Sequence, residues 1–340
     1  MANSPKKIPY VRLGNSGLKV SRFILGTMQY GDKRWQPWVL DDQAEVTRHV
    51  KAAYDAGIQT FDTADVYSNG VSEILLGNAI KELKLPREEI VVMTKLYETI
   101  VTDFSTNFMI TGENPDEHGY VNQHGLSRKW PEYEFLDYID LLQCHRFDQD
   151  TPIEETMQAL HDVVKAGYVR YIGMSSCYAW QFSIMQNYAL THHLTPFISM
   201  QNHYNLVYRE EEREMIPTLK HFGVGMLPWS PIAKGLLTRP LTEKTTRGST
   251  DWAITKYLEG LGTEQIIKRV EEVSKKRGIT MAQVAVAWVL TKDPTACPVV
   301  GTTSLKNLDD LLGAVNVVLT PEEMKYLEEP YRPQGIVGHA

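Results

Sequence analysis

Four polar side chains lie at or just after the ends of strand-like runs, where they could carry proton transfer. They are Asp62, Tyr67, Lys95 and His145. A lysine that directly follows a buried strand needs a partner, because lysine is almost never fully buried alone. Asp62 ends the neighbouring run, so it can form an ion pair with Lys95 and bring a cation beside Tyr67. A nearby cation lowers the pKa of a phenol from its usual value of about 10, which would make Tyr67 a usable proton donor.

His145 would complete such a site by orienting a substrate oxygen through a second hydrogen bond. The set would then protonate a developing alkoxide while another group delivers a hydride. Taken singly, each residue has an ordinary structural explanation: a satisfied core histidine, a buried ion pair or a loop anchor. Four such residues at the ends of neighbouring strands favour a catalytic role for the set.

Eight strand-like runs, each followed by a helical pattern, supply the elements that must position these side chains. The runs cover residues 23–27, 59–62, 90–94, 139–145, 171–175, 197–201, 225–229 and 298–301. Strands that alternate with amphipathic helices predict parallel pairing, and eight units predict a closed (β/α)8 TIM barrel. The alternative is an open doubly wound sheet, but no GxGxxG turn follows the first run. A hairpin around 13–18 is expected to close the barrel floor.

Helix boundaries are marked by capping residues. Thr151-Pro152-Ile153-Glu154 predicts a capping box, and Thr280 and Thr320 are expected to open two later helices. Gly278 follows three basic residues and is expected to end a helix. Two long connections, 97–126 and 234–262, follow strands and are therefore expected on the C-terminal face, as lids or binding loops.

Composition limits the remaining classes of function. The 340 residues carry 35 basic and 42 acidic side chains, for a net charge of −7, and no internal linker is visible, so we expect one domain over 1–340. The acidic balance argues against nucleic-acid binding. No apolar run is long enough for a membrane span, and no signal peptide is expected. Three scattered cysteines predict a reduced, cytoplasmic protein without a metal site.

Three ordered segments resemble the aldo-keto reductase family. They are GIQTFDTADVYSNGVSEILLG at 57–77, QNHYNL at 201–206 and GVGMLPWSP at 223–231. The likeness runs from about residue 13 to the C-terminus, and the branch resembles aryl-alcohol dehydrogenase-like and potassium-channel β-subunit-like members. It implies a (β/α)8 barrel that reduces aldehydes or ketones with NADPH, itself oxidised to NADP+. It also implies Tyr67 as general acid, Lys95 as the group that lowers its pKa, Asp62 as the holder of Lys95, and His145 as the group that orients the carbonyl.

The same resemblance assigns the cofactor contacts. The expected residues are Gly26, Thr27, Met28 and Asp62; Ser175, Ser176 and Gln201 at the nicotinamide carboxamide; Trp229 stacked on the nicotinamide; Ser230, Pro231, Ile232, Lys234, Gly235 and Leu236 at the pyrophosphate; Gly301, Thr302, Thr303, Ser304, Lys306 and Asn307 at the 2′-phosphate; and Asp310 near the adenine. Small hydroxyl residues before a helix offer N–H groups to an anion, although an ordinary serine N-cap also explains Ser304. Lys306 favours NADPH over NADH, whereas Leu311 departs from the Asn of many members.

Aromatic residues after the first and third strands predict a substrate pocket. Tyr30, Trp35 and Tyr97 are the expected contacts, with Trp38, Phe104 and Phe108 nearby. Local loop packing explains the same residues equally well. An aromatic mouth would favour an aromatic or bulky apolar aldehyde or ketone.

One departure from the family concerns the segment 130–137, which leads directly to the fourth strand. The third barrel helix is expected to be about two turns short, which predicts lower stability than in a full-length relative. Two alternatives to a reductase therefore stand: a cofactor-binding regulatory module that acts through a partner, or a destabilised inactive paralogue. The sequence identifies no protein partner.

Overall fold

The barrel consists of eight parallel strands that pair in a ring. The computed structural model describes residues 8–101, 103–129, 138–243, 252–293 and 295–339. The strands are β3 (Ile24–Gly26), β4 (Thr60–Asp62), β5 (Val91–Leu96), β6 (Ile139–Cys144), β7 (Val169–Ser175), β8 (Phe197–Gln201), β9 (Gly225–Met226) and β10 (Val299–Val300). β10 pairs with β3, and Trp229, just beyond β9, forms a parallel bridge to Val299. The sheet therefore returns on itself, and the predicted barrel is confirmed.

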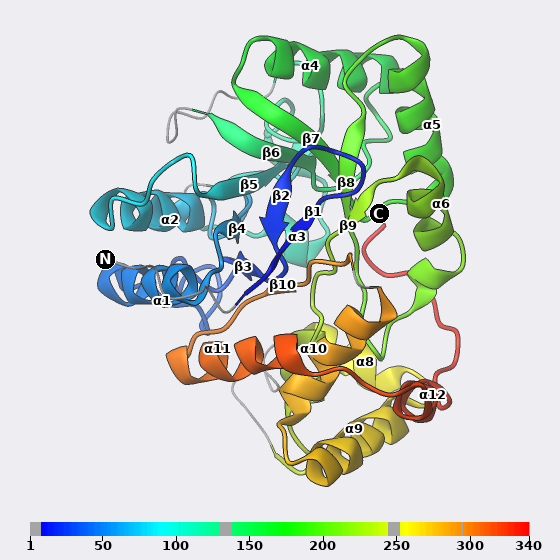
Figure 1. Cartoon of the computed structure of the whole chain (residues 1–340). Coiled ribbons are helices and arrows are strands. Elements are labelled where there is room, and N and C mark those ends of the chain that lie inside the picture. The colour runs from blue at the N-terminus through cyan, green and yellow to red at the C-terminus, as the bar shows by residue number, and fades with distance from the viewer. Residues whose placement is uncertain (1–7, 102, 130–137, 244–251, 294, 340) are drawn as a thin grey trace.

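Helices surround this ring (Figure 1). They are α1 (Gln43–Ala56), α2 (Val71–Glu82), α4 (Ile153–Lys165), α5 (Ala179–Thr191), α6 (Met215–Phe222), α8 (Trp252–Glu259), α9 (Thr263–Arg277), α10 (Met281–Lys292), α11 (Leu305–Leu312) and α12 (Pro321–Glu328). Short helical turns are η2 (Glu210–Glu212), η3 (Ala233–Thr238) and η4 (Gly313–Asn316). None of the helices in the described part of the chain is long and apolar enough to cross a membrane.

The third crossover departs from this pattern. In its described part, the connection from β5 to β6 contains α3 (Phe108–Thr111) and the 3₁₀ turn η1 (Pro115–His118). Each has four residues. The helix expected near 131–136 lies outside the described residues, so its predicted length stays a prediction.

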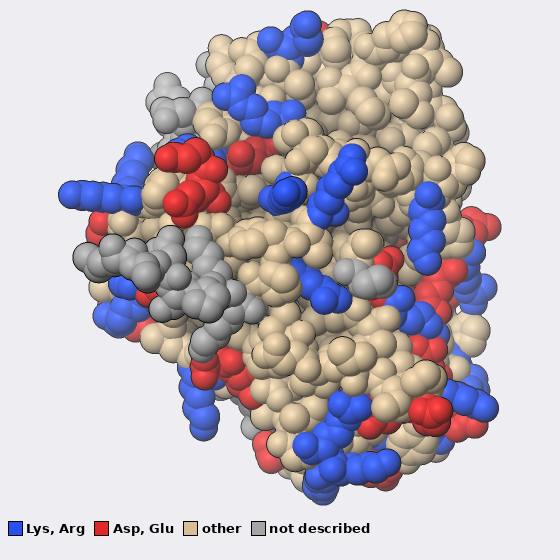
Figure 2. All heavy atoms as spheres, viewed as in Figure 1, with Lys and Arg blue, Asp and Glu red and all other residues tan. Residues whose placement is uncertain are grey.

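An antiparallel hairpin covers the N-terminal end of the barrel. β1 (Tyr10–Arg12) pairs with β2 (Lys19–Ser21), and the Asn15 N–H donates to the Gly223 carbonyl at 2.7 Å. Gly14 sits at φ 55°, where a Cβ would lie 2.4 Å from the same carbonyl oxygen, so only glycine fits the turn. The predicted floor is confirmed. Figure 2 shows this face, on which basic and acidic side chains are intermixed over uncharged surface.

Helix caps agree with the sequence at three of four positions. Thr280 and Thr320 cap α10 and α12, and Gly278 ends α9 in the left-handed conformation. The capping box predicted at Thr151 is wrong. Thr151 instead donates its hydroxyl to Asp148 Oδ2 at 2.7 Å, and Pro152 occupies the N-cap of α4 without a side-chain bond. The Thr151 hydroxyl is therefore bonded to the Asp148 carboxylate and does not cap the helix.

Candidate active site

Three neighbouring strands bring the four predicted catalytic side chains together. Lys95 Nζ donates to Asp62 Oδ2 at 2.6 Å, to the Thr63 carbonyl at 2.8 Å and to Tyr67 Oη at 3.3 Å. The Tyr67 and His145 rings meet edge to face with centroids 6.0 Å apart. All four side chains are buried. β4, β5 and β6 are parallel and adjacent, so their C-terminal ends meet at one edge and place these groups in contact.

The charges in this cluster fix its protonation. Burial alone would lower the pKa of Lys95, but Asp62 and Tyr67 outweigh it and the pKa is raised, so Lys95 stays an ammonium. Burial raises the pKa of Tyr67, while Lys95 lowers it in opposition. The net pKa of Tyr67 is raised, so the lowered pKa expected from the sequence is wrong: the cation is present, but burial of the phenol outweighs it. Burial, Arg146 and Lys95 together lower the pKa of His145 well below its usual range, which keeps the imidazole neutral.

Asp62 is held by two further side chains. Gln143 Nε2 and Gln201 Nε2 donate to Asp62 Oδ1 at 3.1 and 2.9 Å, and Gln201 Nε2 also reaches Gln143 Oε1 at 3.2 Å. Gln143 pairs directly with Lys95 in the β5–β6 register. Sequence analysis missed Gln143. The available signal was one amide in the otherwise apolar strand 141–144, two residues before His145.

The residues expected at the nicotinamide lie next to this cluster. Trp229 Nε1 donates to Ser176 Oγ at 2.9 Å, and the Trp229 ring stacks on His203 with centroids 4.0 Å apart. His203 stacks in turn on Tyr208. Ser175 Oγ donates to the Gln201 carbonyl at 2.9 Å. The Trp229 indole is thus held by the His203 ring on one face and by the Ser176 hydroxyl at its ring nitrogen.

The segment expected at the pyrophosphate has an unusual backbone. Ser230, Ala233 and Lys234 adopt φ values of 53°, 47° and 55°, and Gly235 adopts 99°. Ile232, at φ −104° and ψ 17°, precedes the left-handed Ala233. Right-handed residues followed by left-handed ones can turn successive N–H groups toward one point and form an anion-binding concavity. In this loop, however, the Ala233 and Gly235 N–H groups donate to the Ser230 and Ile232 carbonyls at 2.9 and 3.0 Å. Non-glycine residues rarely hold this conformation unless a site requires it.

The remaining cofactor candidates lie in two environments: the residues just before α11 bond to one another, whereas Asp310 bonds to α10 and its N-cap. Ser304 caps α11, accepting from the Asn307 N–H at 3.5 Å, and Thr302 Oγ1 accepts from the Ser304 N–H at 3.2 Å. Asp310 instead accepts from Thr280 Oγ1 at 2.8 Å and from Gln283 at 3.1 Å, so its carboxylate is engaged by the start of α10.

The residues after β3 also contact the tetrad region. Thr27 donates its N–H to the Asp62 carbonyl at 2.9 Å, and Gly26 pairs with Asp62 in the β3–β4 register. Met28 packs against the cluster of Trp35 and Tyr67. The residues that follow β3 therefore border the C-terminal end of β4, which carries Asp62.

The expected substrate residues do not all come together. Trp35 packs in one cluster with Tyr67, and Trp38, Phe104 and Met109 cover that cluster. Tyr97 packs against a different, larger core. Tyr30 is fully buried among α1 residues, where its ring meets His49 edge to face. The aromatic wall beside Tyr67 thus consists of Trp35 and its neighbours, with Tyr30 in another layer.

Comparison with known proteins shows which family this chain resembles. A model of the family described as "Aldo/keto reductase family" matches residues 22–332. "Putative aryl-alcohol dehydrogenase AAD16" of Saccharomyces cerevisiae is 45% identical over 338 residues, covering 96% of this chain and 98% of its own. "Versiconal hemiacetal acetate reductase" of Aspergillus parasiticus is 47% identical over 342 residues, with coverage of 96% and 98%. "Aldo-keto reductase dtxS3" of Metarhizium robertsii is 45% identical, with coverage of 99% and 95%.

Proposed function

The chain belongs to the aldo/keto reductase family, and we propose that it reduces an aldehyde or ketone to the alcohol with NADPH, using Tyr67 as proton donor. Its membership makes it an oxidoreductase. One observation carries the finer proposal: the Lys95 ammonium lies 2.6 Å from Asp62 Oδ2 and 3.3 Å from Tyr67 Oη in a buried site. An ion pair placed against a phenol is an arrangement for releasing and recovering its proton.

The residues present fit NADPH. The left-handed backbone at Ser230, Ala233 and Lys234 supports the pyrophosphate assignment, because such strained conformations cluster at ligand sites. Trp229 presents a fixed aromatic ring beside the tetrad. The residues that would hold the cofactor are Ser175, Ser176 and Gln201 at the carboxamide, Trp229 at the nicotinamide, 230–236 at the pyrophosphate, and 301–307 at the 2′-phosphate. When bound, NADPH supplies the hydride that reaches the carbonyl carbon.

The chain's own residues would handle the proton. The raised pKa of Tyr67 keeps its phenol protonated at neutral pH until a substrate oxygen gains negative charge. The proton then moves from Tyr67 Oη to that oxygen, and Lys95 stabilises the phenolate left behind. Asp62 holds Lys95 in place. Neutral His145 can donate one ring N–H to the same oxygen and thereby orient the carbonyl.

The aromatic wall favours aromatic or bulky apolar carbonyl compounds. Trp35 is buried against Tyr67, so an apolar ring entering beside the phenol would contact indole rather than water. We expect higher kcat/KM for benzaldehyde than for short polar aldehydes. Equal efficiency on both would contradict this assignment of substrate class.

Cofactor choice has its own test. Lys306 follows the cap residue Ser304 in the first turn of α11. Lys306→Glu should therefore lower kcat/KM for NADPH about tenfold and leave the value for NADH unchanged. If Lys306→Glu keeps the preference for NADPH, Lys306 does not bind the 2′-phosphate, and that contact is assigned to Thr302, Thr303 and Ser304. A cytoplasmic location is supported by three free, buried cysteines, which suit a reducing compartment.

A further inference from the structure

Arg146 is a charged residue beside the active site that the proton-transfer scheme does not use. It is the first residue after His145 and lies just beyond the C-terminal end of β6. Its Nη1 donates to the His145 carbonyl at 2.6 Å, and the side chain is only partly exposed. Across the described residues, no carboxylate forms an ion pair with it. Arg146 thus differs from Lys95, whose charge Asp62 balances at 2.6 Å.

The C-terminal tail places Arg146 against the proposed nicotinamide site. A Cβ built on Gly338 would lie 4.0 Å from Arg146 Nη2 and 3.6 Å from Trp229 Cζ2. The guanidinium and the Trp229 ring therefore flank the same tail residue. The tail is fixed there, because His339 Nε2 bonds to Glu211 at 2.9 Å and the Val337 N–H donates to Tyr208 Oη at 3.0 Å. In Figure 1 this red segment returns from α12 toward α6 and β9.

Some of the groups on which the Arg146 charge acts belong to the same site, although others, such as Cys177, do not. Its charge acts on Tyr67 and His145, and on Glu98 just beyond β5. Burial raises the pKa of the Glu98 carboxyl and outweighs the Arg146 charge, which lowers it; the two residues form no ion pair. Among the described residues, the Arg146 guanidinium therefore has no carboxylate partner at ion-pair distance. A partly desolvated cation of this kind is stabilised when a ligand supplies the counter-charge.

We propose that Arg146 binds a carboxylate on the carbonyl substrate, so that the preferred substrates are aromatic aldehydes or ketones that carry an acid group. This inference rests on the proposed reductase function and narrows its substrate class. The planar guanidinium offers parallel N–H groups that match the two oxygens of a carboxylate. The Trp35 cluster would contact the ring and Arg146 the acid, while Tyr67 and His145 reach the carbonyl oxygen.

The test compares kcat/KM for the three carboxybenzaldehyde isomers with the corresponding formylbenzamides, which have nearly the same shape but no charge. The natural protein should prefer at least one acid over its amide by about 10- to 100-fold. Arg146→Gln should bring that ratio close to one, and Arg146→Lys should retain part of it. The ratio of kcat/KM for the acid to kcat/KM for the amide is compared within each variant. Any change in the reactivity of Tyr67 caused by Arg146 affects both substrates and therefore cancels. Arg128→Gln, which removes an exposed arginine paired with Asp162, is the matched control and should keep the natural ratio.

Two further results distinguish failure of this inference from failure of the proposed function. A ratio that is the same in the natural protein and in Arg146→Gln overturns the role of Arg146 and leaves the reductase intact. Absence of turnover on every aldehyde counts against the reductase itself. In that case, binding of benzoate and benzamide to the NADP+-loaded protein, followed by calorimetry, still tests Arg146. Benzoate should bind about tenfold more tightly than benzamide, and only when Arg146 is present.

Discussion

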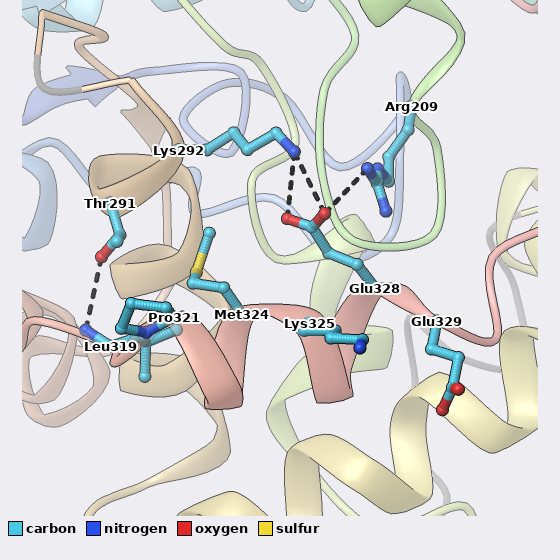
Figure 3. A pocket seen from close by; sticks show the side chains of 9 residues that line it. All are labelled: Arg209, Thr291, Lys292, Leu319, Pro321, Met324, Lys325, Glu328 and Glu329. Atoms are coloured by element: carbon cyan, nitrogen blue, oxygen red, sulfur yellow. Dashed lines mark hydrogen bonds and ion pairs between the residues drawn. The ribbon is translucent and has the colours of Figure 1, made fainter.

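Two charged networks in this barrel use similar residues in different ways. In the barrel centre, the Lys95–Asp62 pair is 0% and 2% exposed, and Tyr67 and His145 stand beside it. On the outside, Glu328 of α12 pairs with Arg209 and with Lys292 of α10, in an open groove of about 700 Å³ (Figure 3). There the three side chains are 11–30% exposed.

The difference lies in which polar atoms remain available. In the outer groove, Glu328 Oε1 accepts from Trp288 Nε1 and Lys292, and Oε2 accepts from Arg209 and Lys292, so both carboxylate oxygens are engaged. In the centre, the His145 Nδ1 atom is buried without a partner, and a phenol stands next to a cation. Both networks join segments distant in sequence, but only the inner one holds an unpartnered imidazole nitrogen to which a ligand could bond. What sets the central site apart is the combination of a buried ion pair, a phenol that contacts its cation and an unpartnered imidazole nitrogen.

Of the variants that test this contrast between the two networks, Lys95→Met should have the largest effect on turnover and on stability. Without its cation, Tyr67 loses the group that stabilises its phenolate, so turnover should fall about 10³-fold or more. The variant also leaves Asp62 as a buried charge, which should lower the free energy of unfolding by about 3–5 kcal/mol. Lys292→Met removes a lysine from the outer network and serves as the control. NADPH consumption and urea unfolding measure both, and equal turnover losses in the two variants would refute the distinction.

Glu73→Gln should raise stability, and only at higher pH. Glu73 of α2 bonds to Thr94 beside Lys95, and burial raises its pKa to about 7. An unfolded glutamate titrates at about 4.3, so between these values the native state binds more protons and stability falls as pH rises. Glutamine lacks this dependence. The variant should gain about 2–4 kcal/mol at about pH 8 and almost nothing at about pH 4. Parallel pH dependence of the melting temperature in both proteins would contradict the assignment.

Glu328→Gln should act in the opposite direction. Its carboxylate serves Arg209, Lys292 and Trp288 in the outer network. Loss of these partly exposed ion pairs should lower the free energy of unfolding by about 1–2 kcal/mol. Turnover should stay unchanged because no tetrad residue is touched. A variant that unfolds normally but loses turnover would show that the groove is coupled to the active site.

Gln143→Leu should give the smallest effect, and it should be confined to chemistry. The change removes one hydrogen bond from Asp62 Oδ1, so kcat should fall about tenfold while cofactor affinity is kept. The pH profile of kcat should also shift, because Asp62 then holds Lys95 less firmly. Gln186→Leu is the matched control: Gln186 is equally buried but bonds to the Phe197 backbone outside the site. Similar activity losses in both variants would reduce Gln143 to a structural role.

Much of the fold and the site follows from sequence, for identifiable reasons. Strand ends in a parallel barrel converge, so the positions of Asp62, Lys95 and His145 along their strands already predicted their meeting. Tyr30 could not be placed in this way, because a residue after a strand can turn inward to the α1 layer as easily as toward the site. Thr151 was misassigned because the competing acceptor, Asp148, is visible only once the loop is folded. Gln143 was missed because one amide in an apolar strand carries no pattern of its own.

The most direct test of the central claim compares the natural protein with Tyr67→Phe. NADPH consumption with benzaldehyde measures turnover, and cofactor fluorescence measures binding in the same samples. We expect turnover to fall by about 10³-fold while cofactor affinity is retained, because only the proton at Tyr67 Oη is lost. Turnover within about twofold of the natural protein would show that Tyr67 is not the proton donor and would contradict the account.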